Sequence, residues 1–328
     1  MTTPVDRRAF VQGALAAAGL APLSSAAPGP RAGEGTHRPE ASAGQVATGA
    51  ITVAGPSSPF LFFSKHLGEL AWPDLGRAVR EMGFDGVDLT VRPGGHVLPA
   101  RVTEDLPRAV AAIRDGGSRV TMITTGLTSP DDPAARPTMA AARAVDVGLL
   151  KAGYYRYAFA DVRKELAEAT TQFRALVQMA SAAGVVLAYH NHSGYIGAPV
   201  WDALRLIEGL PPSATGLYFD VRHATVEGGE AGWRVATQMA APYLRMLAAK
   251  DFYWDKGRDG RWRVVDCPIG EGMVDWKTFA AEIRRAGFTG PISLHVEYEP
   301  GGRTPAEKTD RMREAAARDR ARLAALLG

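Results

Sequence analysis

Residues 161–192 read DVRKELAEATTQFRALVQMASAAGVVLAYHNH, and they contain a long helix candidate followed by a short apolar run that ends in polar residues. The helix candidate, 161–183, stops at a glycine, as helices often do. Other segments, such as 72–83 and 275–287, place apolar residues at three- and four-residue spacing and also end at a glycine. The repeating unit of the chain is therefore a short strand joined to an amphipathic helix.

Short apolar runs like 185–190 recur along the chain, and each is followed by a helical pattern. This alternation favours parallel strands joined by crossover helices. An open doubly wound sheet uses the same alternation, but it normally carries a glycine-rich phosphate turn after its first strand, and FFSKH at 62–66 is no such turn. Eight units predict an α/β fold of the closed (β/α)8 TIM barrel type. The expected strands are 60–64, 86–89, 119–124, 147–151, 185–190, 216–220, 246–250 and 291–297.

The N-terminal segment has the order of an export signal. Arg7 and Arg8 precede an alanine-rich apolar run at 14–22, and small residues follow at 24–27. This order is typical of a twin-arginine signal peptide, so we expect a periplasmic or secreted protein. A bilayer span needs about 20 apolar residues, so no permanent membrane anchor is expected. The predicted organisation is a signal peptide at 1–27, a flexible linker rich in Gly, Pro, Ala and Ser at 28–50, and a barrel domain at 51–328.

The charge balance argues against a nucleic-acid partner. The chain has 38 Lys and Arg against 35 Asp and Glu, and no basic run stands out. Cys267 is the only cysteine, so no intrachain disulfide can form and the core must supply the stability. The sequence is compatible with a homo-oligomer and does not specify an oligomeric state.

Polar residues gather where the predicted strands end. In a barrel of this type the chemistry lies at the C-terminal ends of the strands, because the βα loops converge there. Most of the seven histidines fall at these places. The polar ends are 88–92 with His96 in the loop beyond, 189–192, 220–223, 250–251, and His295 with Glu297.

Strand periodicity brings several of these residues to one side. Side chains alternate along a strand, so His295 and Glu297 point the same way, while the apolar Leu294 and Val296 point to the surrounding helices. We expect His190, Asp220, His295 and Glu297 to converge at the barrel mouth. Imidazole and carboxylate together suit a divalent metal such as Zn, Mn or Fe(II), and mixed ligands do not choose among these.

At this point the motifs GFDGVD at 83–88, YHNH at 189–192, FDVRHA at 219–224, PIGEG at 268–272 and GFTG at 287–290 carry a resemblance. The region from about residue 55 to 300 resembles the xylose-isomerase-like barrel family of sugar phosphate isomerases and epimerases. The family includes ketose 3-epimerases and inosose dehydratase and commonly binds a divalent metal through strands five to eight. The resemblance implies ligands at His190, where many relatives have Glu, at Asp220, and at Glu297 or its neighbour His295.

The chain departs from the family at strand seven. Relatives commonly show His-x-Lys-Asp there, whereas this chain has Ala248 in place of the histidine. Two expectations follow: His295, His192 or His223 replaces the missing ligand, or the site works without metal and Lys250 or Arg92 balances the negative charge.

The expected reaction is proton abstraction next to the carbonyl of a sugar or keto-sugar, with a metal or cation stabilising the enediolate. Glu297 and His190 are candidates for base or ligand, while Lys250, Arg92 and His96 are candidates for acid, oxyanion stabiliser or substrate clamp. Reprotonation gives an epimer or an isomer, and loss of a β-oxygen makes the enzyme a lyase or dehydratase, with a 3-keto-glycoside as one substrate. A non-catalytic periplasmic sugar-binding protein is the alternative outside enzymes. A nuclease is disfavoured, because the extra histidines that nuclease relatives need are not evident.

Overall fold

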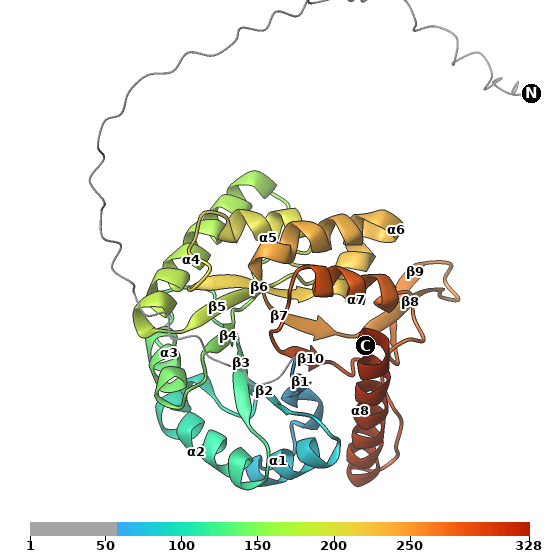
Figure 1. The fold of residues 1–328 in the computed structure, drawn as a ribbon. Coiled ribbons are helices and arrows are strands. Elements are labelled where there is room, and N and C mark those ends of the chain that lie inside the picture. The colour runs from blue at the N-terminus through green and yellow to red at the C-terminus, as the bar shows by residue number, and fades with distance from the viewer. Residues whose placement is uncertain (1–57) are drawn as a thin grey trace, which may run out of the picture. The chain divides into compact units, whose positions relative to one another are not determined.

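The computed structural model describes residues 58–328, and these form a closed parallel barrel (Figure 1). The expected eight-stranded barrel is confirmed. The signal peptide and linker predicted for residues 1–50 lie outside the described residues, as do 51–57. Around the barrel the strands are β1 (Phe60–Phe63), β10 (Ile292–Leu294), β7 (Leu244–Ala249), β6 (Thr215–Asp220), β5 (Val186–His190), β4 (Leu149–Lys151), β3 (Val120–Thr125) and β2 (Gly86–Val91).

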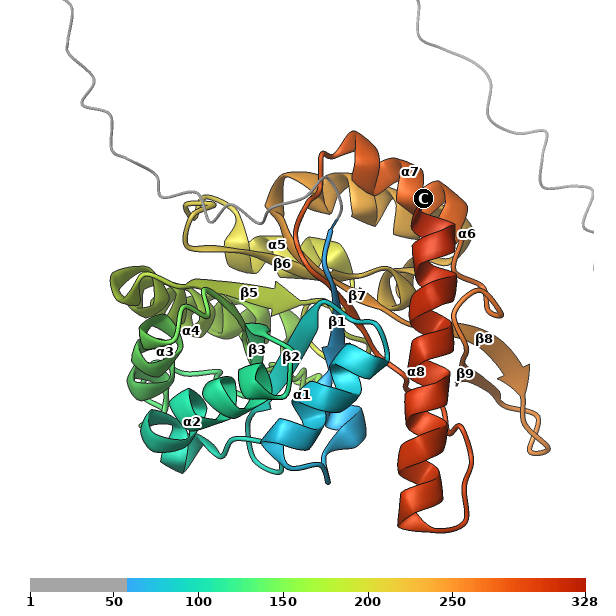
Figure 2. The same ribbon diagram turned by 60° about the horizontal axis from the view of Figure 1, so that its bottom comes forward.

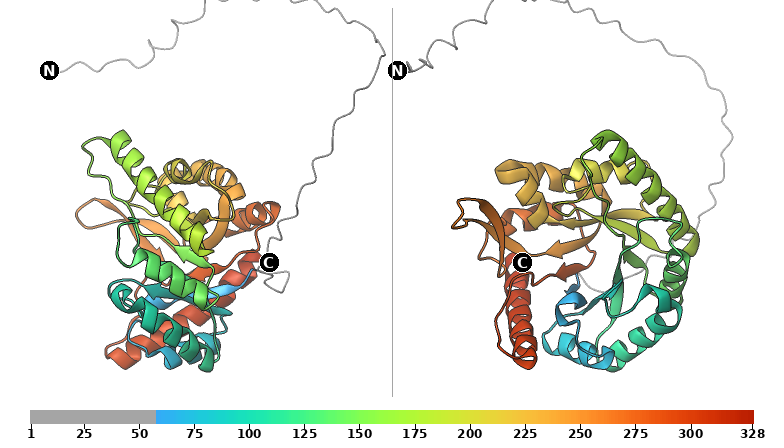
Figure 3. Two further views of the ribbon diagram at one scale, coloured as in Figure 1. Left: turned by 90° about the vertical axis from the view of Figure 1, so that its left-hand side faces the viewer. Right: turned by 180° about the vertical axis from the view of Figure 1, so that it is seen from behind.

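Helices connect successive strands and form an outer ring (Figures 1 and 3). Across residues 58–328, no helix combines the length and the apolar character needed to cross a membrane. The α-helices are α1 (Trp72–Glu81), α2 (Val102–Asp115), α3 (Ala135–Ala144), α4 (Val162–Ala183), α5 (Val200–Ile207), α6 (Val221–Ala240), α7 (Trp276–Arg285) and α8 (Pro305–Leu327). Short 3-10 turns occur at η1 (Ser64–Leu67), η2 (Pro99–Arg101) and η3 (Ala241–Tyr243).

An antiparallel hairpin interrupts the alternation between β7 and α7. Its strands are β8 (Asp251–Lys256) and β9 (Trp262–Cys267), which pair only with each other. The hairpin projects outward from the barrel (Figure 2). The hairpin was not predicted, because most of its residues are exposed or half-buried and do not form the short apolar runs that mark the barrel strands.

The eighth barrel strand is shorter than the predicted 291–297. Leu294 is paired with Ala249, the last residue of β7, after which the chain leaves the barrel for the hairpin. His295 still donates its backbone N–H to the Ala249 carbonyl at 2.9 Å. His295 and Glu297 therefore lie just beyond the strand, at the mouth rather than within the sheet.

The core has two parts that follow from the alternation of side chains along each strand. The larger part packs the outward faces of the strands against the helices. A smaller cluster fills the inside of the barrel with Leu61, Met122, Ala188, Tyr218, Met246 and Ala248. Two residues beyond Ala188, Tyr218 and Ala248 come His190, Asp220 and Lys250, which continue the inward face as polar groups. Strand periodicity thus places these three side chains directly above the apolar cluster inside the barrel.

Candidate active site

A cavity of about 180 Å³ opens among side chains at the C-terminal ends of the barrel strands. Pockets for drug-sized ligands start at about 300 Å³, so this cavity suits a small molecule. Its lining combines basic, acidic and aromatic side chains from all eight barrel strands and the loops after them: Phe63, Lys65, Arg92, Thr124, Tyr154, His190, His192, Tyr195, Tyr218, Lys250, His295 and Glu297.

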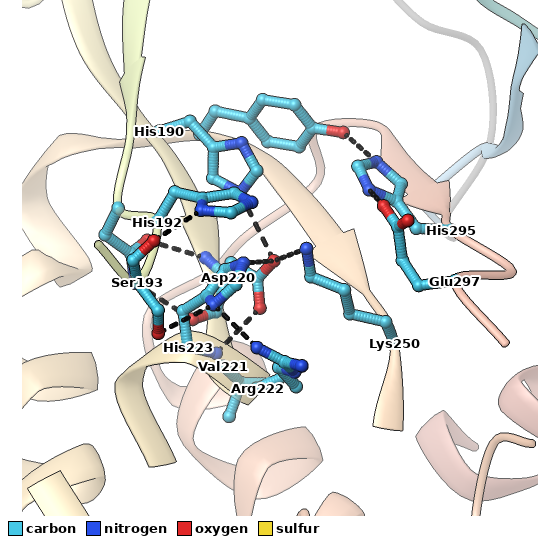
Figure 4. A network of polar contacts seen from close by, with 12 residues as sticks. His190, His192, Ser193, Asp220, Val221, Arg222, His223, Lys250, His295 and Glu297 are labelled. Atoms are coloured by element: carbon cyan, nitrogen blue, oxygen red, sulfur yellow. Dashed lines mark hydrogen bonds and ion pairs between the residues drawn. The ribbon is translucent and has the colours of Figure 1, made fainter. Parts of the chain in front are cut away.

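Asp220 is the centre of one polar group beside this cavity (Figure 4). It ends β6 and caps α6, because its Oδ1 accepts the backbone N–H of His223 at 3.0 Å. Its Oδ2 lies 3.1 Å from Lys250 Nζ and 3.2 Å from His190 Nε2. Burial alone would raise the pKa of Asp220, but Lys250 and His223 outweigh burial and hold that pKa well below its usual range. Asp220 is therefore a buried carboxylate with its own internal cation.

The hairpin supports His223 indirectly, through Arg222. Its Nδ1 lies 3.0 Å from Arg222 Nη1 and 3.1 Å from Ser193 Oγ. Arg222 in turn forms an ion pair with Asp266 of β9. Within the described part of the chain, His223 Nε2 is buried without a hydrogen-bond partner, 3.6 Å from Asp220 Oδ2.

Three side chains form a group that could hold a metal ion. The ligand atoms of His190, Asp220 and His223 all lie within 4.8 Å of one another, and all three residues are buried. Two imidazoles and one carboxylate are a usual donor set for Zn or Fe(II). Lys250 Nζ contacts the same carboxylate oxygen, so an ion and the ammonium compete for one position.

The four residues predicted as metal ligands therefore fall into two separate groups. His190 and Asp220 lie together with His223, which the sequence analysis named as a replacement ligand. His295 and Glu297 lie on the other side of Lys250 (Figure 4), and the His190 and His295 ring centroids are 6.2 Å apart.

His295 and Glu297 make a second polar group. His295 Nδ1 lies 3.7 Å from Glu297 Oε1, and Lys65 Nζ contacts Glu297 Oε2 at 2.8 Å. Burial lowers the pKa of His295 to about 4, so this imidazole is neutral at pH 7. Burial alone would raise the pKa of Glu297, but the neighbouring His295 and the charge of Lys250 outweigh burial and hold that pKa well below its usual range. Glu297 is an ionised carboxylate facing the cavity.

Of the remaining predicted residues, Arg92 and His190 line the cavity and His96 does not. Arg92 lines the cavity, with its guanidinium 5.6 Å from the centre of the Phe63 ring. His190 lines it too, and burial lowers its pKa to about 3. His96 is not among the lining residues. Its backbone N–H and its Nδ1 both contact Thr90 Oγ1, and its Nε2 lies 3.2 Å from the Leu67 carbonyl.

A buried network beneath the cavity was not predicted. Asp88 of β2 lies inside the barrel with no exposed surface, and it accepts hydrogen bonds from Thr124, Tyr218 and Ser293. Burial raises the pKa of Asp88 to about 6. The signal was present in the sequence: Asp88 is an acid inside the run GVDLTV, where an inward position is otherwise filled by an apolar or neutral side chain.

Comparisons with known proteins agree with this architecture. The profile of a family described as "Xylose isomerase-like TIM barrel" matches residues 77–322. No curated protein matches the chain in sequence.

Solved structures with the same fold include three whose chains are covered almost completely. A xylose isomerase-like TIM barrel protein from Mycobacterium smegmatis, in complex with magnesium, has a TM-score of 0.60 at 18% identity, over 83% of this chain and 98% of that one. A D-allulose 3-epimerase from Methylomonas sp. has a TM-score of 0.62 at 15% identity, over 83% and 98%. A 3-keto-D-glucoside 4-epimerase from E. coli has a TM-score of 0.58 at 16% identity, over 81% and 100%. At these identities the likeness establishes the fold.

Proposed function

The chain belongs to the xylose isomerase-like TIM barrel family, and from this premise we propose that it is a sugar isomerase or epimerase that removes a proton from the carbon next to a carbonyl. The substrate is a sugar or keto-sugar small enough for the cavity. Fold alone fixes no activity, so the proposal depends on the side chains in the mouth.

One observation carries the proposal: a single cavity is lined by an ionised carboxylate and by cationic groups. Glu297 and His295 supply the basic groups, and Lys250 and Arg92 supply the cationic groups. Proton abstraction next to a carbonyl needs a base at the carbon and a positive group where negative charge develops on the oxygen. Both kinds of group line the same cavity.

The residues divide the chemistry between them. Glu297 removes the proton as an ionised carboxylate, and Lys250 or Arg92 stabilises the enediolate oxygen. Return of the proton to the other face of the same carbon gives an epimer, and return to the neighbouring carbon gives an isomer.

A divalent metal fits the group His190, Asp220 and His223. The fit rests on the buried Nε2 of His223, which has no hydrogen-bond partner within residues 58–328 and faces Asp220. A metal bound there would act as a Lewis acid that polarises the substrate carbonyl. Lys250 then has to move away from Asp220, because two cations cannot share one oxygen at 3 Å without strong repulsion.

The test is exchange of substrate protons with solvent. Ketoses and 3-keto-glycosides are incubated with the protein in D2O, and loss of the proton signal next to the carbonyl is followed by NMR. Glu297→Gln should lower the exchange rate by about 10²- to 10⁴-fold. Glu299→Gln, on an exposed side chain two residues away, is the matched control and should exchange like the parent. Sugar binding without any exchange would instead support the binding-protein alternative, and an eliminated product would support the lyase.

We also propose that residues 1–27 direct twin-arginine export, which favours a free or glycosidic sugar over a phosphorylated one, since phosphorylated sugars are chiefly cytosolic. The support is the order of Arg7 and Arg8, the apolar run and the small residues. Replacing both arginines by lysine should retain a fused reporter in the cytoplasm. Export of the double variant at the parental level would contradict this.

A further inference from the structure

We propose that Asp88 and Tyr218 are positioning residues that hold His295 in one tautomer, so that its Nδ1 takes up the proton that Glu297 removes from the substrate. The inference rests on the proposed function for its chemistry, but its structural half can be measured without any substrate.

The three side chains form a hydrogen-bonded chain from inside the barrel to its mouth. Tyr218 OH lies 3.1 Å from Asp88 Oδ2 and 2.9 Å from His295 Nε2. All three residues are buried, and they come from β2, from β6 and from the residue after β10. At the outer end, His295 Nδ1 faces Glu297 Oε1. This series of hydrogen bonds therefore connects the fully buried carboxylate of Asp88 to the proposed base, Glu297.

The hydrogens of this chain can be assigned by counting donors at Asp88. Its Oδ1 accepts from Thr124 Oγ1 at 2.7 Å, and its Oδ2 accepts from Ser293 Oγ at 2.9 Å and from Tyr218 OH. Among the residues that the structure describes, no ion pair to Asp88 is formed, so these three hydroxyl groups are what compensate its buried charge. An ionised carboxylate can only accept hydrogen bonds. Each of the three hydroxyl groups therefore donates its one hydrogen bond to Asp88.

The tautomer of His295 follows from this count. Because the hydrogen of Tyr218 goes to Asp88, the phenol oxygen can only accept from His295 Nε2. A neutral imidazole with hydrogen on Nε2 carries its lone pair on Nδ1. Nδ1 and Glu297 Oε1, 3.7 Å apart, are then two acceptors that face each other, and a proton bound to either atom draws them to hydrogen-bond distance.

This arrangement gives the removed proton a defined place. The substrate C–H bond breaks, its electron pair moves to the carbonyl oxygen as an enediolate, and an O–H bond forms on Glu297. Transfer from Oε1 to Nδ1 regenerates the carboxylate and leaves an imidazolium. The Tyr218 oxygen stabilises the new positive charge by accepting from Nε2, while the Tyr218 hydroxyl still donates its hydrogen bond to Asp88. The reverse transfers carry the proton back through Glu297 to the enediolate, and its delivery to the neighbouring carbon gives the isomer.

The first experiment observes the tautomer directly. Nitrogen-15 NMR of the labelled full-length protein, with His295 assigned by comparison with His295→Gln, should show hydrogen on Nε2 and a lone pair on Nδ1 at neutral pH. Hydrogen on Nδ1 would overturn the inference. This measurement depends neither on a substrate nor on the folding of a redesigned core.

The second experiment removes one hydroxyl group. Tyr218→Phe should lower the rate of solvent deuterium exchange about 10- to 100-fold, the usual effect of losing a partner that orients a functional imidazole, and should change the His295 nitrogen signals. Tyr189→Phe is the matched control, since Tyr189 is equally buried and its hydroxyl donates only to the Ile196 carbonyl. Asp88→Asn serves as a second variant and should likewise disturb the His295 nitrogen signals.

The outcomes separate this inference from the proposed function. Exchange in Tyr218→Phe within twofold of the parent, together with loss of exchange in Glu297→Gln, would overturn the role of Asp88 and Tyr218 and keep the proposed reaction. Absence of exchange with every sugar would reject the proposed reaction, and with it the proton transfer inferred here, while the NMR result would still decide the tautomer.

Discussion

Replacing Lys250 by methionine removes the closest cation from the buried carboxylate of Asp220. The side chains of Lys250 and Asp220 are 3% and 0% exposed, and Nζ lies 3.1 Å from Oδ2. Breaking a buried ion pair from one side typically costs about 3–5 kcal/mol, because the remaining charge stays buried without its counterion. His190 and His223 remain next to the carboxylate, so we expect the lower end, about 3 kcal/mol.

The loss can be measured by thermal and urea unfolding of the Lys250→Met variant. For a chain of this size, 1 kcal/mol shifts Tm by about 2 °C, so Tm should fall by about 6 °C. Adding Asp220→Asn should recover most of the loss, since the double variant buries no unpaired charge, and asparagine is also a good helix N-cap for α6. Zn or Mn should stabilise Lys250→Met more than the parent, by about 2.7 kcal/mol at 100 times its Kd, and should not stabilise the double variant. A Lys250→Met protein as stable as the parent, or no recovery in the double variant, would refute this account of Asp220.

Three further predictions concern stability. Burial raises the pKa of Asp88 from 3.8 to about 6, so the folded state keeps this proton to higher pH than the unfolded state; its contribution of about 3 kcal/mol is present below about pH 4 and is lost as pH rises through 6. Asp88→Asn should remove this part of the pH dependence in urea unfolding between pH 4 and 7, and identical slopes in both proteins would contradict it. Asp251 accepts from the backbone of Gly270 and from Trp276 Nε1, so Asp251→Ala should cost about 3 kcal/mol by leaving buried donors unpaired, and a calorimetric loss below 1 kcal/mol would argue against this role. Thr304 caps α8 in a capping box, so Thr304→Ala should cost about 1 kcal/mol, and an unchanged urea midpoint would show that the cap does not matter.

The barrel and much of its mouth were predictable because both follow from short-range periodicity. The period of two along 185–190 and 216–220 places His190 and Asp220 on the inward face before any tertiary contact is known. The same period carries Lys250 to the mouth two residues after Ala248. These placements need only the strand and the direction of the core.

The pairing of residues across the barrel could not be obtained in this way. Tyr218 reaches Asp88 and His295 only because the sheet closes, and they are 130 and 77 residues away in the sequence. His96 was expected at the mouth, but the loop after β2 folds back through a bridge between Val91 and Val97 and turns the imidazole toward Leu67. The division of the expected metal ligands depends on where Lys250 lies, which no local pattern specifies.

The β8–β9 hairpin is fastened at its base by two carboxylates, since Asp251 binds the following loop and Asp266 binds Arg222. Its far end, around Gly260, is exposed and touches neither fastening. Residues at that end can therefore be exchanged, lengthened or carry a fluorescent label without loosening either attachment.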